Sequence, residues 1–474
     1  MSSNDDRYDT ALATDLYQLA MAAAYYFSAY HNDRKMRGIF ELFVRTLPRN
    51  RSYLVAAGLE QIIHFILNMK FNDNHISYLK SLEIFQHIPS VFFDYLRRFN
   101  FTGDVWAVHE GTILFPYEPI IRVEAPIIEA QIIESYILSM INFQSLIATK
   151  ASRVVTAAKG RPVIEFGSRR AHGPQAAFLA ARAAYIAGCI GTSNTLAGYK
   201  LGIPVFGTMA HSFIMSFEKE EEAFQQFNNV FPHAFLLVDT YDTINAIKNI
   251  IKLGIKTNGI RLDSGDLYFL SIQARNLLDN VEGGKYSNTK IMASGDLNEY
   301  IIRDLVNKNA PIDFFGVGTE LSTSRDDPAM NGLYKLVAVK LIQPSSSNNN
   351  NRIAEDDHTI MKIQYKLKTS IGKKNFPAPK QIYRLLKNNA LKVDYIALED
   401  ENDFPEGSIP LLQKYIHKGK IACEMPSIKQ IQDYHINQLQ LLPTQFKDLD
   451  FIPKQFPITY SKKLEEILQQ FKIC

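Results

Sequence analysis

Short apolar runs alternate with polar loops and helical stretches through the middle of the chain. The runs occupy residues 162–167, 204–207, 235–239, 259–263, 290–295, 313–318 and 334–339, with 188–193 as a further candidate. Strands that are apolar on both faces are typical of a parallel sheet covered by helices. Counting the further candidate, eight such units predict an α/β fold built on a β/α barrel.

The two ends of the chain follow a different pattern. Residues 11–30 have apolar positions at helical spacing, with Thr14 or Asp15 as the candidate N-cap. Further along, the pattern predicts a strand at 37–48, helices within 52–100, short strands within 103–126 and helix over 127–158. Near the C-terminus it predicts strands at 360–370 and 380–388 and a helix at 461–474. The first of these regions therefore forms an α+β unit beside the barrel.

This pattern divides the chain into three parts. They are an N-terminal α+β domain at 1–145, a β/α-barrel catalytic domain at 146–340, and a C-terminal segment at 341–474 that packs back on the first domain. The run PSSSNNNNR at 344–352 has the composition of a disordered surface loop.

Composition narrows the function classes. The 474 residues are 46% hydrophobic and 21% charged, and the net charge of +3 gives no reason to expect binding to nucleic acid or to a membrane surface. Cys189, Cys423 and Cys474 are too far apart for a zinc motif or a disulfide framework. The N-terminus lacks the pattern of a signal peptide, and glutamates interrupt the most apolar stretch, so we expect a cytoplasmic protein.

Two arginines follow the first apolar run of the middle region. Arg169 and Arg170 precede a helix that Pro174 can open at its first position. At the carboxyl end of a barrel strand, an arginine can bind a carboxylate or a phosphate in forked geometry. The alternative is an ordinary surface ion pair.

Two later strand ends share a Ser-Gly-Asp motif. RLDSGDL at 261–267 contains Arg261, Asp263 and Asp266, and ASGDL at 293–297 contains Ser294 and Gly295. The aspartates can accept hydrogen bonds from sugar hydroxyls or bind a hydrated Mg²⁺. The alternative is helix capping by Asp and Ser, which explains one such motif more easily than two.

The stretch GVGTELSTS at 316–324 follows a strand that we count as the seventh. Gly316 and Gly318 allow backbone N–H groups to approach a phosphate, and Thr319 adds a hydroxyl donor. Barrels often bind phosphate after strands seven and eight. A plain glycine turn is the alternative, and no GxGxxG dinucleotide motif is present.

One histidine follows the apolar run at 204–207. His211 lies in VFGTMAHSF and is interpretable as a core residue, a metal ligand or a reactive nitrogen. The 11 histidines of the chain show no spacing typical of a metal site. The predicted position at the same edge as the other polar residues favours a role at the site.

These motifs together resemble the nicotinate phosphoribosyltransferase family. The matching stretches are TDLYQLAM (14–21), FELFVR (40–45), EFGSRRAHGP (165–174), GTSN (191–194), GTMAHSF (207–213), GIRLDSGDL (259–267), ASGDL (293–297), GVGTEL (316–321) and GLYKLVAV (332–339). They occur in order over residues 9–340, whereas the Asn-rich run departs from the family pattern. The resemblance implies an irregular α/β barrel beside an α+β domain built from both ends of the chain.

The resemblance also implies an activity. Nicotinate and phosphoribosyl pyrophosphate would give nicotinate mononucleotide and pyrophosphate with Mg²⁺, in the first step of NAD synthesis from nicotinate. ATP hydrolysis would be coupled to this reaction through phosphorylated His211, because a neutral imidazole nitrogen is a competent nucleophile near pH 7.

Individual residues carry roles by the same resemblance. Tyr17 would reach the pyridine ring from the neighbouring subunit of a homodimer, although it is equally interpretable as a core tyrosine, and Arg169 would pair with the nicotinate carboxylate. The other roles are substrate contact by Thr208 and Arg261, ribose and Mg²⁺ contact by Asp263 and Asp266, and 5′-phosphate binding by Ser294, Gly295, Gly318 and Thr319.

Four other functions compete with this one. A nicotinamide phosphoribosyltransferase has no need of a cation for a carboxylate, and a quinolinate phosphoribosyltransferase has no reason to keep a reactive histidine. A non-catalytic nucleotide-binding protein would have lost residues from the matched motifs. A metal-dependent barrel lyase would need a tight set of His and carboxylate ligands.

Overall fold

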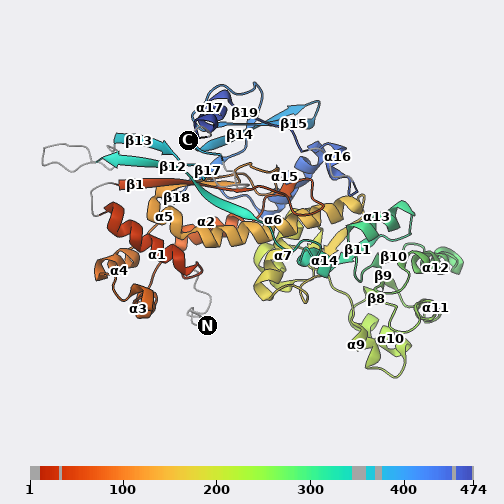
Figure 1. Cartoon of the computed structure of the whole chain (residues 1–474). Helices are drawn as coiled ribbons and strands as arrows, with labels where there is room; N and C mark the ends of the chain where they lie inside the picture. Colours follow the sequence, from red (N-terminus) through yellow and green to blue (C-terminus); the bar gives the residue numbers. More distant parts are fainter. Residues whose placement is uncertain (1–10, 31–34, 344–358, 369–375, 451–454, 472–474) are drawn as a thin grey trace.

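The computed structural model describes residues 11–30, 35–343, 359–368, 376–450 and 455–471. The Asn-rich run at 344–352, predicted to be a disordered loop, lies outside the described residues. Figure 1 shows a layered arrangement in which strands from both ends of the chain form one unit and the middle of the chain forms a second.

The first unit is built on an antiparallel sheet with strands from both ends of the chain. Its order is β13-β12-β1-β5-β3-β17-β18. The strands are β1 (Lys35–Val44), β3 (Asp104–Ala107), β5 (Ile121–Pro126), β12 (Gly332–Gln343), β13 (Thr359–Tyr365), β17 (Gln413–His417) and β18 (Lys420–Ile421). Strands β13, β17 and β18 from the C-terminal part thus share one sheet with β1, β3 and β5 from the N-terminal part.

Smaller sheets and helices surround this sheet. The small sheets contain β2 (Leu54–Val55) with β4 (Ile113–Leu114), and β14 (Lys380–Lys387), β15 (Ala390–Leu398), β16 (Ile409–Pro410) and β19 (Ile458–Tyr460). The helices are α1 (Leu16–Tyr25), the π-helical η2 (Tyr26–Tyr30), α2 (Leu59–Asn68), α3 (Asp73–Ser81), η3 (Glu83–Phe85), α4 (Ser90–Arg97), α15 (Ile428–Leu441), α16 (Thr444–Lys447) and α17 (Lys462–Gln470). These positions agree with the helices and strands expected at both ends of the chain.

The N-terminus of α1 differs from the expected cap. Asp15 occupies the N-cap position, but its side chain makes no capping hydrogen bond and instead accepts one from the hydroxyl of Ser135 at 2.6 Å. Thr14 donates its hydroxyl to the carbonyl of Ile132 at 3.3 Å. Asp15 is thus the N-cap residue as predicted, but both polar side chains bind the following helical region instead of capping their own helix.

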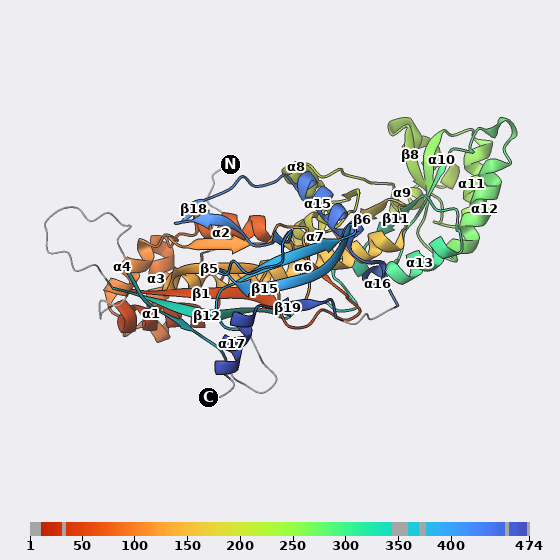
Figure 2. The same ribbon diagram turned by 90° about the horizontal axis from the view of Figure 1, so that it is seen from above.

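A long helix connects the two units. After α5 (Ile127–Ile132), α6 (Glu134–Ala157) runs along the molecule from the N-terminal helices to the second sheet (Figures 1 and 2). Residues 127–157 are apolar and long enough to cross a membrane by length and composition, but 56% of the most apolar window is buried inside the fold. Burial within the protein explains the apolar composition. The predicted cytoplasmic location stays a prediction.

The second unit is built on a parallel sheet with the order β7-β6-β11-β10-β9-β8. The strands are β6 (Val163–Glu165), β7 (Gly191–Thr192), β8 (His233–Leu237), β9 (Thr257–Leu262), β10 (Lys290–Ala293) and β11 (Phe314–Val317). The connecting helices are α7 (Pro174–Ile186), α8 (Thr195–Leu201), α9 (His211–Met215), α10 (Glu220–Val230), α11 (Thr243–Lys252), α12 (Leu267–Asp279), η4 (Glu282–Gly284), α13 (Glu299–Asn307) and α14 (Thr319–Ser322). This sheet is the irregular, incomplete barrel of the expected α/β fold.

The predicted count of eight barrel strands is wrong. Residues 204–207 contribute one isolated bridge, between Val205 and Thr192. Residues 334–339 belong to β12, which pairs with β1 in the antiparallel sheet. An apolar run shows that a strand is buried but not which strand it pairs with. In consequence β11 is the sixth strand of the parallel sheet along the chain, not the seventh.

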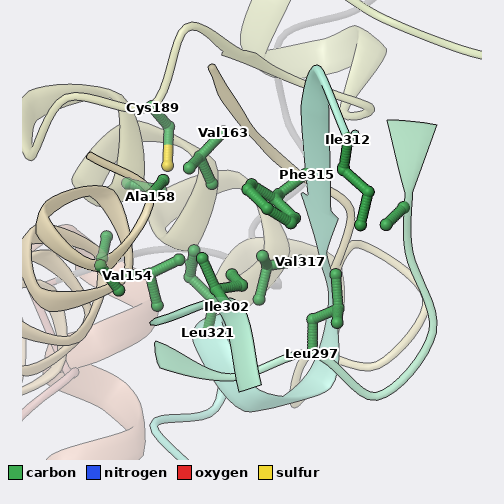
Figure 3. Close-up of a cluster of buried hydrophobic side chains, with 14 of the residues drawn as sticks. Val154, Ala158, Val163, Cys189, Leu297, Ile302, Ile312, Phe315, Val317 and Leu321 are labelled. Carbon is green, nitrogen blue, oxygen red and sulfur yellow. The ribbon is translucent and has the colours of Figure 1, made fainter. Parts of the chain in front are cut away.

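The core behind the parallel sheet fixes its position against α6. Val154 and Ala158 pack with Val163 of β6 and with Phe315 and Val317 of β11 (Figure 3). All five are less than 2% exposed. Burial of this apolar surface stabilises the sheet.

A buried histidine holds α15 against both units. His435 is fully buried, with Nδ1 3.0 Å from the carbonyl oxygen of Gly111 and Nε2 3.1 Å from Oγ of Ser152. A carbonyl can only accept, so Nδ1–H donates to Gly111 and Nε2 accepts from the hydroxyl of Ser152. Burial lowers the pKa of His435 from 6.5 to about 4.

We expect this histidine to make folding sensitive to acid. Its folded pKa lies below its unfolded pKa, so the stabilisation is complete above the unfolded value and is lost as the pH falls toward 4. Between about pH 7 and about pH 4.5 the unfolding free energy should fall by about 2 kcal/mol more in the wild type than in His435→Asn. Urea unfolding of both proteins at the two pH values measures this difference. Equal losses would contradict the assignment.

Candidate active site

The carboxyl ends of the parallel strands surround a cavity of about 640 Å³. Its lining includes every predicted site residue except two. These lining residues are Arg169, Arg170, Thr208, His211, Arg261, Asp263, Ser294, Gly295, Gly316, Gly318 and Thr319. Residues from several separate loops meet here because parallel strands end at one edge of a sheet.

An ionic cluster at the end of β9 forms one wall of the cavity. The Arg261 guanidinium donates to Oγ1 of Thr208 and lies 3.2 Å from Oδ1 of Asp263. The hydroxyl of Ser294 donates to the same carboxylate. Burial opposes ionisation of Asp263, but Arg261, Ser294 and the nearby ring of His211 together hold its pKa below the ordinary value. Asp263 is therefore a carboxylate near neutral pH, able to accept hydrogen bonds or bind a cation.

His211 is the first residue of α9 and faces this cluster. Nδ1 is 3.1 Å from Oγ1 of Thr240, and Nε2 is 3.7 Å from Oδ2 of Asp263. The side chain is 40% exposed, so the interpretation of His211 as a core residue is wrong. Thr240 engages one ring nitrogen and leaves the other directed toward the carboxylate. The reactive-nitrogen interpretation of His211 stays a prediction.

The two arginines extend from the loop after β6. Both are exposed, and neither forms an ion pair with any carboxylate of the described residues. The alternative of a surface ion pair is therefore wrong for the described part of the chain. Pro174 is at the first position of α7, as the sequence predicts. Arg169 and Arg170 thus bring two positive charges to the cavity without a neutralising partner from these residues.

Backbone groups line the edge formed by β10 and β11. Gly295 has φ +84°, and a β-carbon there would lie 1.8 Å from the carbonyl oxygen of Asp263. At Gly316 a β-carbon would lie 2.5 Å from an aromatic ring. Gly318 precedes α14, which begins at Thr319. Protein atoms therefore already leave no room for a side chain at Gly295 or Gly316, which the alternative of a plain glycine turn also explains. The phosphate site stays a prediction.

Two predicted site residues lie outside the lining of the cavity. Asp266 is exposed and caps α12 by accepting from the amide of Phe269 at 3.0 Å, so the capping alternative describes it. Tyr17 lies on α1, 51% exposed, with its hydroxyl 2.8 Å from Nε2 of Gln18. The interpretation of Tyr17 as a core tyrosine is therefore wrong.

The sequence analysis missed Asp239 and Thr240, which follow β8. Oδ2 of Asp239 accepts from the amide of Asp263 at 3.1 Å and from the hydroxyl of Ser264 at 2.5 Å. Oδ1 is shielded from solvent and has no hydrogen-bond partner among the described residues. The signal was present in FLLVDT, where polar residues follow an apolar strand in the same way as at the other strand ends.

The chain matches known proteins over nearly its whole length. Models of the nicotinate phosphoribosyltransferase N-terminal domain, family and C-terminal domain match residues 12–142, 162–379 and 407–468. A nicotinate phosphoribosyltransferase of Mycobacterium tuberculosis is 39% identical, covering 96% of this chain and 92% of that protein. One of Bacillus subtilis is 38% identical, covering 95% of this chain and 93% of that protein.

Two solved structures share the fold of this chain. Human nicotinic acid phosphoribosyltransferase shares the fold with a TM-score of 0.80 at 24% identity, covering 97% of this chain and 100% of that one. A nicotinate-nucleotide pyrophosphorylase of Pyrococcus furiosus has a TM-score of 0.69 at 26% identity, covering 93% and 97%. From its matched domains and its curated relatives, the chain belongs to the nicotinate phosphoribosyltransferase family.

Proposed function

We propose that this protein joins nicotinate to 5-phosphoribosyl 1-pyrophosphate, forming nicotinate mononucleotide and pyrophosphate. One observation carries the proposal within the family. Two arginines without an ion-pair partner among the described residues share a cavity with a backbone-lined edge and a carboxylate cluster. The arginines suit the carboxylate of a pyridine acid, and the glycine-rich edge suits a 5′-phosphate. The product is the first nucleotide in NAD synthesis from nicotinate.

The reaction is a substitution at the anomeric carbon of the ribose. The pyridine nitrogen forms the new C–N bond as the C–O bond to pyrophosphate breaks, and the pyrophosphate keeps the bonding electrons. Gly295, Gly318 and Thr319 bind the 5′-phosphate, and Asp263 accepts from a ribose hydroxyl. Arg169 and Arg170 hold the nicotinate carboxylate. Positioning and electrostatic stabilisation of an oxocarbenium-like centre supply the catalysis, without a protein nucleophile at this step.

Two aspartates at neighbouring strand ends suit a magnesium ion. Asp263 lines the cavity, and Asp239 lies behind it, with a buried Oδ1 that has no hydrogen-bond partner among the described residues. No group of three or more His, Cys, Asp or Glu side chains in the described part of the chain forms a complete ligand set. One or two carboxylates together with substrate phosphates is the usual environment of Mg²⁺. Bound there, Mg²⁺ would neutralise charge on the pyrophosphate.

His211 supplies the coupling to ATP in this proposal. Its Nε2 attacks the γ-phosphorus of ATP, ADP leaves with the bonding electrons, and water later cleaves the phosphohistidine to release phosphate. The contact between Nδ1 and Thr240 supports this role because it leaves Nε2 available. Burial of the added phosphate near Arg261 would favour binding of the sugar pyrophosphate.

We also propose that two copies of the chain share each active site. Leu16 and Tyr17 on α1 are 48% and 51% exposed, and Ile84 of η3 beside them is 53% exposed. Apolar groups at this exposure suit contact with a second copy, whose cavity Tyr17 would then enter. The enzyme is proposed to work in the cytoplasm.

The first prediction for this function concerns the base that is consumed. With phosphoribosyl pyrophosphate and Mg²⁺, nicotinate should give a mononucleotide, and ATP should increase the yield with release of ADP. Nicotinamide should give none because it has no carboxylate for the arginines, and quinolinate should give none because its second carboxylate would have to be removed in the reaction. Mass spectrometry of the products checks this. A product from nicotinamide alone would contradict the proposal and indicate a nicotinamide phosphoribosyltransferase. The absence of product from every base would favour a nucleotide-binding protein.

A second prediction separates the two half-reactions. His211→Asn keeps a polar side chain but removes the nucleophile, so ATP hydrolysis and ATP stimulation should fall by at least about 100-fold. The slow formation of nicotinate mononucleotide without ATP should persist. Parallel assays of ADP and nucleotide measure the two. Unchanged ATP hydrolysis in His211→Asn would contradict the phosphohistidine.

A third prediction concerns the arginines. Arg169→Gln removes a charge-assisted, forked contact, so the KM for nicotinate should rise by about 10- to 100-fold. The KM for phosphoribosyl pyrophosphate should change little. Arg275→Gln, which removes a partly exposed arginine of α12, is the control because Arg275 does not line the cavity. Equal effects on both substrates would place Arg169 at the phosphates instead.

A further inference from the structure

Glu165 is a buried carboxylate directly beneath the cavity. It is the last residue of β6 and is 1% exposed. Oε2 accepts from the hydroxyl of Thr192 at 2.5 Å, and Oε1 accepts from the amide of Gly167. Oγ1 of Thr192 accepts in turn from the amide of Asn194 at 2.9 Å. A single side chain therefore connects the loops that follow two neighbouring strands.

No cation of the described residues forms an ion pair with Glu165. Burial raises the pKa of this carboxyl, while the hydrogen bonds from Thr192 and Gly167 act against that rise. Each oxygen of the carboxyl group accepts one of these two hydrogen bonds. Burial of a carboxyl group without an ion pair is costly, and an apolar residue would serve stability better. This energetic cost suggests that Glu165 serves to position the neighbouring loops rather than to stabilise the fold.

The two loops that Glu165 connects supply residues to the lining of the cavity. The first contains Arg169 and Arg170, and the second contains Ser193, and all three residues line the cavity. The amide of Gly167 donates to Glu165, and the carbonyl of Gly167 accepts from the amide of Arg170 at 2.8 Å. The position of the arginines thus depends on the turn that Glu165 anchors.

Close packing makes this turn specific. A β-carbon at Gly167 would lie 2.2 Å from Oγ of Ser322 and 2.8 Å from Oε1 of Glu165. The loop is confined between the carboxylate on one side and α14 on the other. Glu165 is thus part of the close packing that determines the position of this turn.

We propose that Glu165, acting with Thr192, is a positioning residue that sets the affinity of the enzyme for the carboxylate of the pyridine acid. It touches no substrate and acts through the loops of Arg169 and Ser193. The ribose and phosphate contacts lie on β9, β10 and β11, which Glu165 does not contact through either carboxylate oxygen. This inference rests on the proposed function, since it assumes that nicotinate binds at the arginines.

Thr192→Val tests the inference because it removes the hydroxyl and keeps the shape. The KM for nicotinate should rise by about tenfold, the size expected for loss of one hydrogen bond to a charged group. The KM for phosphoribosyl pyrophosphate and kcat should change by less than about twofold. Thr192→Ser retains the hydroxyl and should restore the wild-type KM. Glu165→Gln should also raise the KM for nicotinate, because an amide nitrogen replaces one acceptor.

Tyr334→Phe is the matched control for a purely structural effect. The hydroxyl of Tyr334 donates to the carbonyl of Ala130 at 2.8 Å in the buried core of the first unit, away from the cavity. Like Thr192→Val, it deletes one buried hydroxyl and should lower Tm. It should leave the KM for nicotinate unchanged.

The outcomes separate this inference from the function on which it rests. An active wild type with an unchanged KM for nicotinate in Thr192→Val, or an equal rise in both KM values, would overturn the positioning role alone. A similar rise in Tyr334→Phe would also overturn it, by showing that loss of stability is sufficient. A wild type that neither binds nicotinate in calorimetry nor forms the nucleotide would overturn the proposed function itself.

Discussion

The parallel direction of six strands is the constraint on which the site depends. Each strand of the sheet β7-β6-β11-β10-β9-β8 delivers its carboxyl end to one edge. Arg169, Thr240, Asp263, Gly295 and Gly318 are far apart in the chain and meet only for this reason. If any strand ran in the reverse direction, the polar loop that follows it would lie at the opposite edge of the sheet. The apolar packing of α6 against β6 and β11 keeps the sheet in place beneath that edge (Figure 3).

Electrostatics gives the two sides of the cavity different chemistry. At the end of β9, Asp263 is balanced by Arg261 and by hydroxyl donors, and its pKa is held low. At the end of β6, Glu165 is balanced by hydrogen bonds alone, while Arg169 above it has no carboxylate partner among the described residues. One side is therefore an acidic cluster balanced by Arg261, and the other carries positive charge that no carboxylate of the described residues neutralises.

Much of the fold was predictable because local sequence patterns indicate the helices and strands. Apolar runs marked the parallel strands, and helical spacing marked α6 and both terminal helices. The count of eight failed at 334–339, where β12 has the apolar composition of a barrel strand but pairs with β1. Strand pairing is a non-local property, so periodicity alone does not decide it. At the site, Asp266 lies outside the cavity lining and caps a helix, and Asp239 was overlooked beside a correctly predicted strand.

The sequence by itself determined which residues are available at the strand ends and, through its ordered motifs, the family of the chain. Only the tertiary structure decided which of them share a cavity. It also decided that Thr240 contacts His211 and that Glu165 connects two loops, because these contacts join residues 29 and 27 positions apart in the chain. The physical reason is that hydrogen-bond geometry and burial depend on distances across strands, and a linear pattern specifies only distances along them.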